Sequence, residues 1–133
     1  MSDALILRLV GVAGLVCGLS CEHSPALDNN LKALRQISLL RGAEVSYHAA
    51  HRRYAGLTAL GPIGDKLISP ELASGATDGY RFYIEVSEVG YRLTASSFSP
   101  GKTGFASYFC DESGIVRRSW GPGRAVASSP PVD

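Results

Sequence analysis

The sequence lacks several features that would quickly place it in a class of protein. It has three cysteines in 133 residues, too few for the disulfide framework of a small secreted domain. Its net charge is only +1, from 13 basic and 12 acidic side chains, and no basic stripe indicates nucleic-acid binding. Its apolar run Leu9–Leu19 is shorter than the roughly 20 residues of a membrane-spanning helix. These absences favour one modest globular domain.

The first 20 residues have the pattern of an export signal. Arg8 supplies a positive charge, and the apolar run that follows it has the length of a signal-peptide core. Glycines within this run make it a poor helix for a soluble core. We therefore predict a signal peptide over residues 1–20 and a location on the periplasmic side of the bacterial cell envelope.

The apolar run ends in Gly18-Leu19-Ser20-Cys21, which resembles a bacterial lipobox. In such a signal, diacylglycerol is attached to the cysteine thiol, and cleavage leaves that cysteine as the first residue. Leucine is usual three positions before the cysteine, and Gly18 departs from this, so ordinary signal-peptide cleavage stays open as an alternative. We predict lipidation of Cys21, which would anchor the protein to a membrane without spanning it. Residues 21–30 would then form a polar spacer.

Residues 31–54 have the spacing of one amphipathic helix. Residues 28–30 are suitable N-caps, and Gly56 is a suitable stop. The apolar residues recur at spacings of three, four or their sums, which predicts one buried stripe. The predicted stripe is Leu31, Leu34, Ile37, Leu40, Tyr47, Ala50 and Tyr54. Glu44 and the other charged residues of this segment fall mainly outside it.

From residue 80 onward the apolar period changes to two, which indicates β-strands. The first strand would bury Tyr80, Phe82, Ile84 and Val86 on one face. Three further strands are predicted by alternating residues and by turn sequences between them. They include Tyr91, Leu93 and Ala95, then Phe105, Ser107 and Phe109, and finally residues 115–120. Short connections make neighbouring strands antiparallel.

The remaining segments complete an α+β fold in one domain, residues 31–120. Residues 57–79 are rich in turn signals and contain one helical turn, with Ser69 as its cap and Pro70 at its first position. Residues 121–133 have several prolines and no apolar period, so we predict a disordered tail. The long N-terminal helix would pack on a four-stranded antiparallel sheet, because the helix stripe and the apolar sheet face must bury each other.

Six short segments, taken in their order and spacing, resemble the globular head of type IV pilins and type II secretion pseudopilins. The segments are Ala33–Ile37, Ala43–Tyr47, Arg53–Leu57, Leu72–Gly75, Gly79–Phe82 and Phe109–Arg117. The resemblance covers about residues 31–119. It implies a non-enzymatic envelope protein that acts through protein–protein contacts, linked to one of these two machineries.

The resemblance does not extend to the segment by which pilins polymerise. A prepilin carries a Gly-Phe processing junction followed by a long apolar helix with an early glutamate. This sequence has neither, and its apolar run ends at Cys21 instead. The pilin-like head is therefore combined with an export or lipid signal, and filament assembly by the usual route is not expected.

No pattern in the sequence predicts a catalytic, cofactor or metal site. His48 and His51 share a helix face, but no carboxylate or cysteine cluster completes a metal site, and a solvated surface is the simpler interpretation. Cys110 has no evident base beside it and is expected to be a buried structural thiol. The Gly-Lys-Thr in residues 101–103 lacks the upstream glycine of a phosphate-binding loop, and a strand follows it.

Exposed aromatic residues on alternating strands can mark a partner site. On this ground we predict a partner surface that includes Tyr83, Tyr108 and Trp120, facing protein partners in the envelope. The alternative hypothesis is a periplasmic module that binds a small ligand through the 57–79 loop and the sheet edge.

Overall fold

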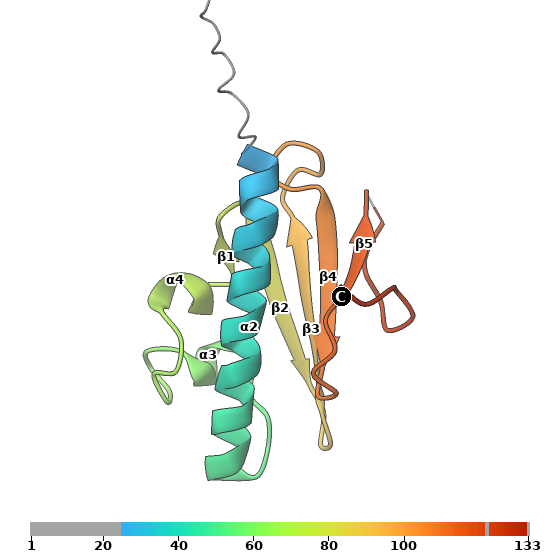
Figure 1. Ribbon diagram of the computed structural model, residues 1–133. Coiled ribbons are helices and arrows are strands. Elements are labelled where there is room, and N and C mark those ends of the chain that lie inside the picture. Colours follow the sequence, from blue (N-terminus) through green and yellow to red (C-terminus); the bar gives the residue numbers. More distant parts are fainter. Residues whose placement is uncertain (1–24, 122, 133) are drawn as a thin grey trace, which may run out of the picture.

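The computed structural model describes residues 25–121 and 123–132, and it has the α+β architecture expected, with a long N-terminal helix on an antiparallel sheet. Figure 1 shows the helix lying lengthwise across one face of the sheet, with two short helices beside it. The elements are α2 (Pro25–His51), α3 (Leu57–Leu60), α4 (Pro70–Ala73), β1 (Ala76–Thr77), β2 (Tyr80–Val86), β3 (Tyr91–Ser97), β4 (Ala106–Asp111) and β5 (Arg117–Trp120).

The sheet has five strands in the order β1-β2-β3-β4-β5, one more than predicted. The additional strand is β1, in which Ala76 pairs with Arg81 and Thr77 with Tyr80. The two residues between β1 and β2, Asp78 and Gly79, have φ values of 55° and 78°. Positive φ at both central residues is typical of the tight turn that joins two antiparallel strands, and Asp-Gly is a preferred sequence for it. The Asp-Gly pair therefore makes a hairpin where we had predicted only a turn.

Helix α2 begins at Pro25, so the predicted spacer is wrong for residues 25–30, which are helical. Proline is well suited to the first position of a helix, because its φ is already helical and its missing N–H has no partner there in any case. The predicted cap Asn30 lies inside the helix and is only 3% exposed. The helix ends at His51, before the predicted limit at Tyr54, and Arg52 follows it with a φ of 64°.

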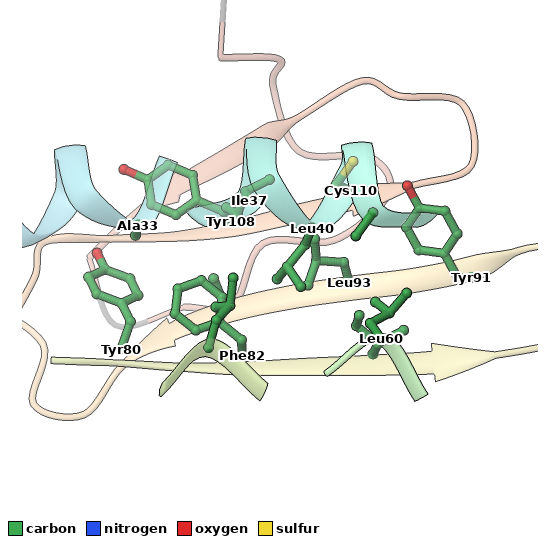
Figure 2. Packing of buried hydrophobic residues seen from close by; sticks show 14 of the residues in the cluster. Ala33, Ile37, Leu40, Leu60, Tyr80, Phe82, Tyr91, Leu93, Tyr108 and Cys110 are labelled. Atoms are coloured by element: carbon green, nitrogen blue, oxygen red, sulfur yellow. The ribbon is translucent and has the colours of Figure 1, made fainter. Parts of the chain in front are cut away.

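The helix is held on the sheet by a buried stripe in which spacings of four and three residues alternate. The stripe is Ala26, Asn30, Ala33, Ile37, Leu40, Glu44 and Tyr47. This spacing keeps successive side chains on one face of an α-helix. The predicted stripe is confirmed at Ile37, Leu40 and Tyr47, but it is wrong at Leu31, which is 56% exposed, and at Ala50. Figure 2 shows Ala33, Ile37 and Leu40 directed toward the sheet.

The helix-facing side of the sheet supplies the other half of the core. Along β2 and β3, buried side chains alternate with more exposed ones, as a period of two predicts. In β2, three of the four residues predicted to be buried are buried. The buried side chains on this side of the sheet are Tyr80, Phe82, Ile84, Tyr91, Leu93, Ala95, Ala106, Tyr108 and Cys110. Val86 was expected among them but is 42% exposed. Leu60 of α3 and Leu72 of α4 join the same cluster, so the 57–79 segment contributes to the core.

Strand β4 is buried on both faces, contrary to the alternation we predicted. Ala106, Tyr108 and Cys110 face the helix, whereas Ser107 and Phe109 face the other side of the sheet. That outer face is covered here by residues 123–132, which were expected to be a disordered tail. Ala125 and Ser129 of this segment are 4% and 9% exposed. A strand that is buried on both faces does not show the alternation of buried and exposed residues that is typical of a strand with one face in solvent.

Within the described residues, none of the helices has both the length and the hydropathy of a membrane span. The predicted signal peptide, residues 1–20, and the predicted lipidation site Cys21 lie outside the described residues.

Candidate interaction surface

The outer face of the sheet, opposite α2, carries two adjoining hollows of about 480 and 460 Å³. Both are lined by Tyr83, Thr94, Ser96, Ser107 and Arg124. The floor comes from alternate residues of β2, β3 and β4, and one wall comes from the C-terminal segment 123–127. We call this the outer groove.

The C-terminal wall of the outer groove is held in place by Ser107 of β4. The Ser107 hydroxyl donates a hydrogen bond to the carbonyl of Gly123 at 2.9 Å and accepts one from the Ala125 amide at 2.8 Å. Further along, Arg117 donates from Nη1 to the carbonyl of Ser129 at 2.9 Å. Ser107 thus fixes the C-terminal segment in place, although the sequence of that segment predicts a disordered tail.

The groove combines aromatic surface with positive charge. The Tyr83 side chain is 63% exposed and lines both hollows. One hollow is lined by Arg81 and Arg124 and by no acidic residue. The other includes Glu85 and Arg92, which are cross-strand partners. An exposed tyrosine beside exposed arginines is typical of protein interfaces, in which both residue types are enriched.

The three aromatic residues predicted to form one partner surface do not lie together. Tyr83 is on the outer face, whereas Trp120 pairs with the helix-facing Ala106 and therefore lies on the opposite side of the sheet. Trp120 is 59% exposed because it lies at the end of the last strand. The prediction for Tyr108 is wrong, since this side chain is 1% exposed and belongs to the core. Strand alternation places Tyr108 on one face of the sheet, but it does not show that this is the face covered by α2.

Cys110 is buried, as predicted, with a fully enclosed side chain facing α2. Burial raises the pKa of its thiol to about 11. Because only the thiolate is a strong nucleophile, a thiol that stays protonated at neutral pH is suited to packing. The other two cysteines lie outside the described residues.

His48 and His51 are both exposed near the end of α2, where each has a local partner. His51 Nε2 lies 2.8 Å from the Asp65 carboxylate, and the His48 ring stacks on Tyr54 at 4.5 Å between centroids. Among the described residues, no three histidine, cysteine, aspartate or glutamate side chains form a group that could hold a metal ion.

Glu44 is the buried acid that the sequence pattern placed outside the apolar stripe. It is 0% exposed, and its Oε1 accepts a hydrogen bond from the Ala55 amide at 2.9 Å. Its Oε2 has no hydrogen-bond partner among the residues that the structure describes. Desolvation raises the pKa of this carboxyl group to about 7, against a smaller opposite effect of the Ala55 bond. Glu44 follows the buried Leu40 by four residues, and this helical spacing is the sequence signal that could have placed it on the buried face.

A second polar contact fixes the beginning of α2 to the sheet. Asn30 Oδ1 lies 2.6 Å from the hydroxyl of Tyr80 and accepts a hydrogen bond from the Phe105 amide at 2.9 Å. The Tyr80 hydroxyl also lies 2.5 Å from the carbonyl of Ala106, and it can donate its single proton to only one of the two oxygens at a time. Burial raises the pKa of Tyr80 to about 12. These contacts are structural.

Comparison of the chain with protein families, curated proteins and solved structures found no match.

Proposed function

We propose that this chain is an exported protein of the bacterial cell envelope, in which a pilin- or pseudopilin-like head acts without catalysis through protein–protein contacts. The machinery it serves would be a type IV pilus or a type II secretion system. The observation that carries the proposal is a long N-terminal helix packed lengthwise on one face of an antiparallel meander whose opposite face is an open groove.

The order of elements supports the pilin-like part of the proposal. The long helix comes first, a segment with two short helices follows, and the strands are consecutive in sequence and in space. The six sequence segments that resemble pilins and pseudopilins fall at corresponding places in this order. Fold alone does not define function, and the proposed contacts therefore rest on the groove.

The outer groove supports the protein-contact part of the proposal. The exposed Tyr83 lines both of its hollows, and the arginine-lined hollow has no acidic residue among the described residues that line it. An arginine pair of this kind complements a carboxylate, which it can bind by charge-assisted hydrogen bonds. The partner segment that fits is therefore an acidic one with an apolar or aromatic side chain for the hollow beside Phe109 and Val126.

Site-specific photocrosslinking in cells tests the contact surface. A photoreactive phenylalanine analogue replaces Tyr83, and the same analogue replaces Ile63 as a matched control. Ile63 is 86% exposed and lies in the segment between α3 and α4. We expect a discrete crosslinked envelope protein from position 83 and none from position 63. Equal crosslinking at both positions, or none at position 83, contradicts the proposed surface.

Mass spectrometry of the mature N-terminus tests export separately. A diacylglycerol-modified Cys21 as the first residue supports the lipid anchor. An unmodified N-terminus at or near that position supports ordinary cleavage, which keeps the export proposal and removes the anchor. A mature protein that still begins with Met1 contradicts export.

A further inference from the structure

The end of the domain where α2 begins carries a rim of three exposed aromatic residues, and two of them, Phe98 and Phe105, also line the arginine-lined hollow of the outer groove. Phe98, Phe105 and Trp120 are 46%, 39% and 59% exposed. Figure 1 shows that the beginning of α2, the connection between β3 and β4 and the end of β5 lie at this one end of the molecule. We call these three residues the aromatic rim.

Hydrogen bonds hold the rim against the start of the helix. Asn29 donates from its side-chain amide to the carbonyl of Thr103 at 2.9 Å, and Asn30 accepts from the Phe105 amide at 2.9 Å. The Gly121 amide, next to Trp120, donates to the carbonyl of Phe105 at 3.0 Å. Trp120 and Phe105 also line one open hollow with Pro100 and Gly101. The rim is therefore part of the folded domain, fixed within a short distance of the point where α2 begins.

The rim is accompanied by positive charge. The guanidinium of Arg118 lies over the Trp120 ring at 4.6 Å, and that of Arg81 lies over the Phe98 ring at 4.9 Å. Lys102 is exposed at the tip of the loop between β3 and β4. Among the described residues, Asp28 in the first turn of α2 is exposed at this end, and the partly exposed Asp78 lies 3.8 Å from Lys32 Nζ. Aromatic rings together with lysine and arginine are the composition found where proteins meet the headgroup region of a membrane with anionic lipids.

The sequence before the helix ties this end to a membrane surface. The apolar run ends at Leu19 and α2 begins at Pro25, which leaves residues 20–24 between them. Five residues reach at most about 17 Å even when fully extended. If the apolar run, or a lipid on Cys21, is held in a bilayer, the start of α2 lies within that distance of the bilayer, and so does the rim end of the domain.

We propose that the aromatic rim of Phe98, Phe105 and Trp120, with Lys102 and Arg118, lies in the headgroup region of a bilayer that contains anionic lipid. The inference depends on the proposed membrane anchorage and adds an orientation to it. Helix α2 points away from the membrane, and the end of α2 and the turn between β2 and β3 lie at the distant end of the domain. Two sites of contact, the anchor and the rim, would hold the domain in one orientation.

Trp120 is the only tryptophan in the chain, so its fluorescence reports on the rim in the full-length protein. The chain is reconstituted in vesicles of phosphatidylethanolamine and phosphatidylglycerol, with and without lipids brominated near the headgroup end of the acyl chain. We expect a blue shift of the emission and a loss of roughly half of its intensity with the brominated lipid. Phe105→Ser and Lys102→Glu in combination should reduce both effects.

A matched control moves the tryptophan to the opposite end. In the Trp120→Phe background, Val89→Trp places the fluorophore in the turn between β2 and β3, where Val89 is 85% exposed. We expect no blue shift and no quenching for this variant, and flotation measured in the same samples shows what fraction of it is bound to the vesicles. Both substitutions are at exposed positions and leave the core unchanged.

The outcomes separate the rim from the anchor. A chain that floats with vesicles but keeps an unshifted, unquenched Trp120 overturns the rim and leaves the anchorage intact. A blue shift without quenching by brominated lipid means that a protein, such as a second copy of the chain, covers the rim, and this also overturns the inference. Equal quenching at both ends overturns the proposed orientation. A chain that does not float overturns anchorage and rim together, whereas the crosslinks at position 83 are independent of both.

Discussion

The two faces of the sheet differ in what covers them, and this difference decides what each can do. The helix-facing side is covered by one continuous buried stripe of α2, so its residues are almost completely buried. The outer side is covered only in part, by the C-terminal segment over β4, and it leaves Tyr83 and three arginines accessible. A face that is sealed by a helix gives stability, whereas a half-covered face gives a shaped surface with polar walls.

The largest effect is expected on the sealed face. Leu40→Ala should lower the free energy of unfolding by about 2–5 kcal/mol, because it removes buried methyl groups and leaves a cavity between α2 and the sheet. Urea unfolding measures the loss. The neighbouring Leu39 is the matched control, because it is 56% exposed whereas Leu40 is 0% exposed. Leu39→Ala should change stability by less than about 0.5 kcal/mol. Equal losses for the two leucines would show that the helix presents a different face to the sheet.

The second effect is a pH dependence that comes from Glu44. Its folded-state pKa of about 7 lies above the ordinary value of 4.5, so the folded protein binds more protons than the unfolded chain between these two pH values. Stability is therefore highest near and below pH 4.5 and falls as the pH rises through about 7. The fall should be roughly 3 kcal/mol, taking about 1.4 kcal/mol per pKa unit.

Glu44→Gln separates this carboxyl group from the other titrating residues. Glutamine keeps the acceptor for the Ala55 amide but does not titrate, so the slope between pH 4.5 and 7 should flatten. Thermal unfolding across this range is the measurement. A slope that is the same in the original chain and in the variant would assign the pH dependence to other groups.

A smaller effect is expected where the outer face is covered. Ser107→Ala removes both hydrogen bonds that hold the C-terminal segment and should lower stability by about 1–2 kcal/mol. Hydrogen exchange at the Ala125 amide should speed up at the same time. Ser119, the cross-strand partner of Ser107, has no side-chain hydrogen bond among the described contacts, so Ser119→Ala serves as the control. Unchanged exchange at Ala125 would mean that other contacts suffice to hold the segment.

The smallest effect on stability is expected at Tyr83, which lines both hollows of the outer groove. Tyr83→Ala should change the free energy of unfolding by less than about 0.5 kcal/mol, because the side chain is 63% exposed. The same substitution should abolish copurification of the partner identified by crosslinking at this position. Loss of stability together with loss of binding would make Tyr83 part of the core and remove it from the proposed surface.

The sequence predicts the middle of the fold better than its edges. Ile37, Leu40 and Tyr47 were placed on the buried face from spacing alone, and so were Phe82, Ile84 and Leu93 in the strands. At the beginning of the helix, the larger apolar residue Leu31 suggested the buried face, although Asn30 and Ala33 occupy it. Apolar size is a poor guide there, because small residues allow close approach of helix and sheet and a buried asparagine is satisfied by its hydrogen bonds.

The candidate site could be predicted only in part. Tyr83 was named from strand alternation, and its exposure agrees with that reasoning. The groove around it could not be named, because its wall is a segment with no apolar period, held by a serine hydroxyl and by backbone bonds. Interactions between residues so far apart in the chain leave no local pattern in the sequence.

By itself, the sequence determined the α+β class, the long N-terminal helix and the antiparallel order of the strands, since each of these follows from local periodicity and turn residues. The burial of Cys110 was predicted on a different ground, because free cysteine is usually buried and no base is evident beside it. Only the tertiary structure decided which strand face α2 covers, and with it the burial of Tyr108, the enclosure of Glu44 and the ordering of residues 123–132. Periodicity states that a face is apolar, but which element covers it depends on packing among distant segments.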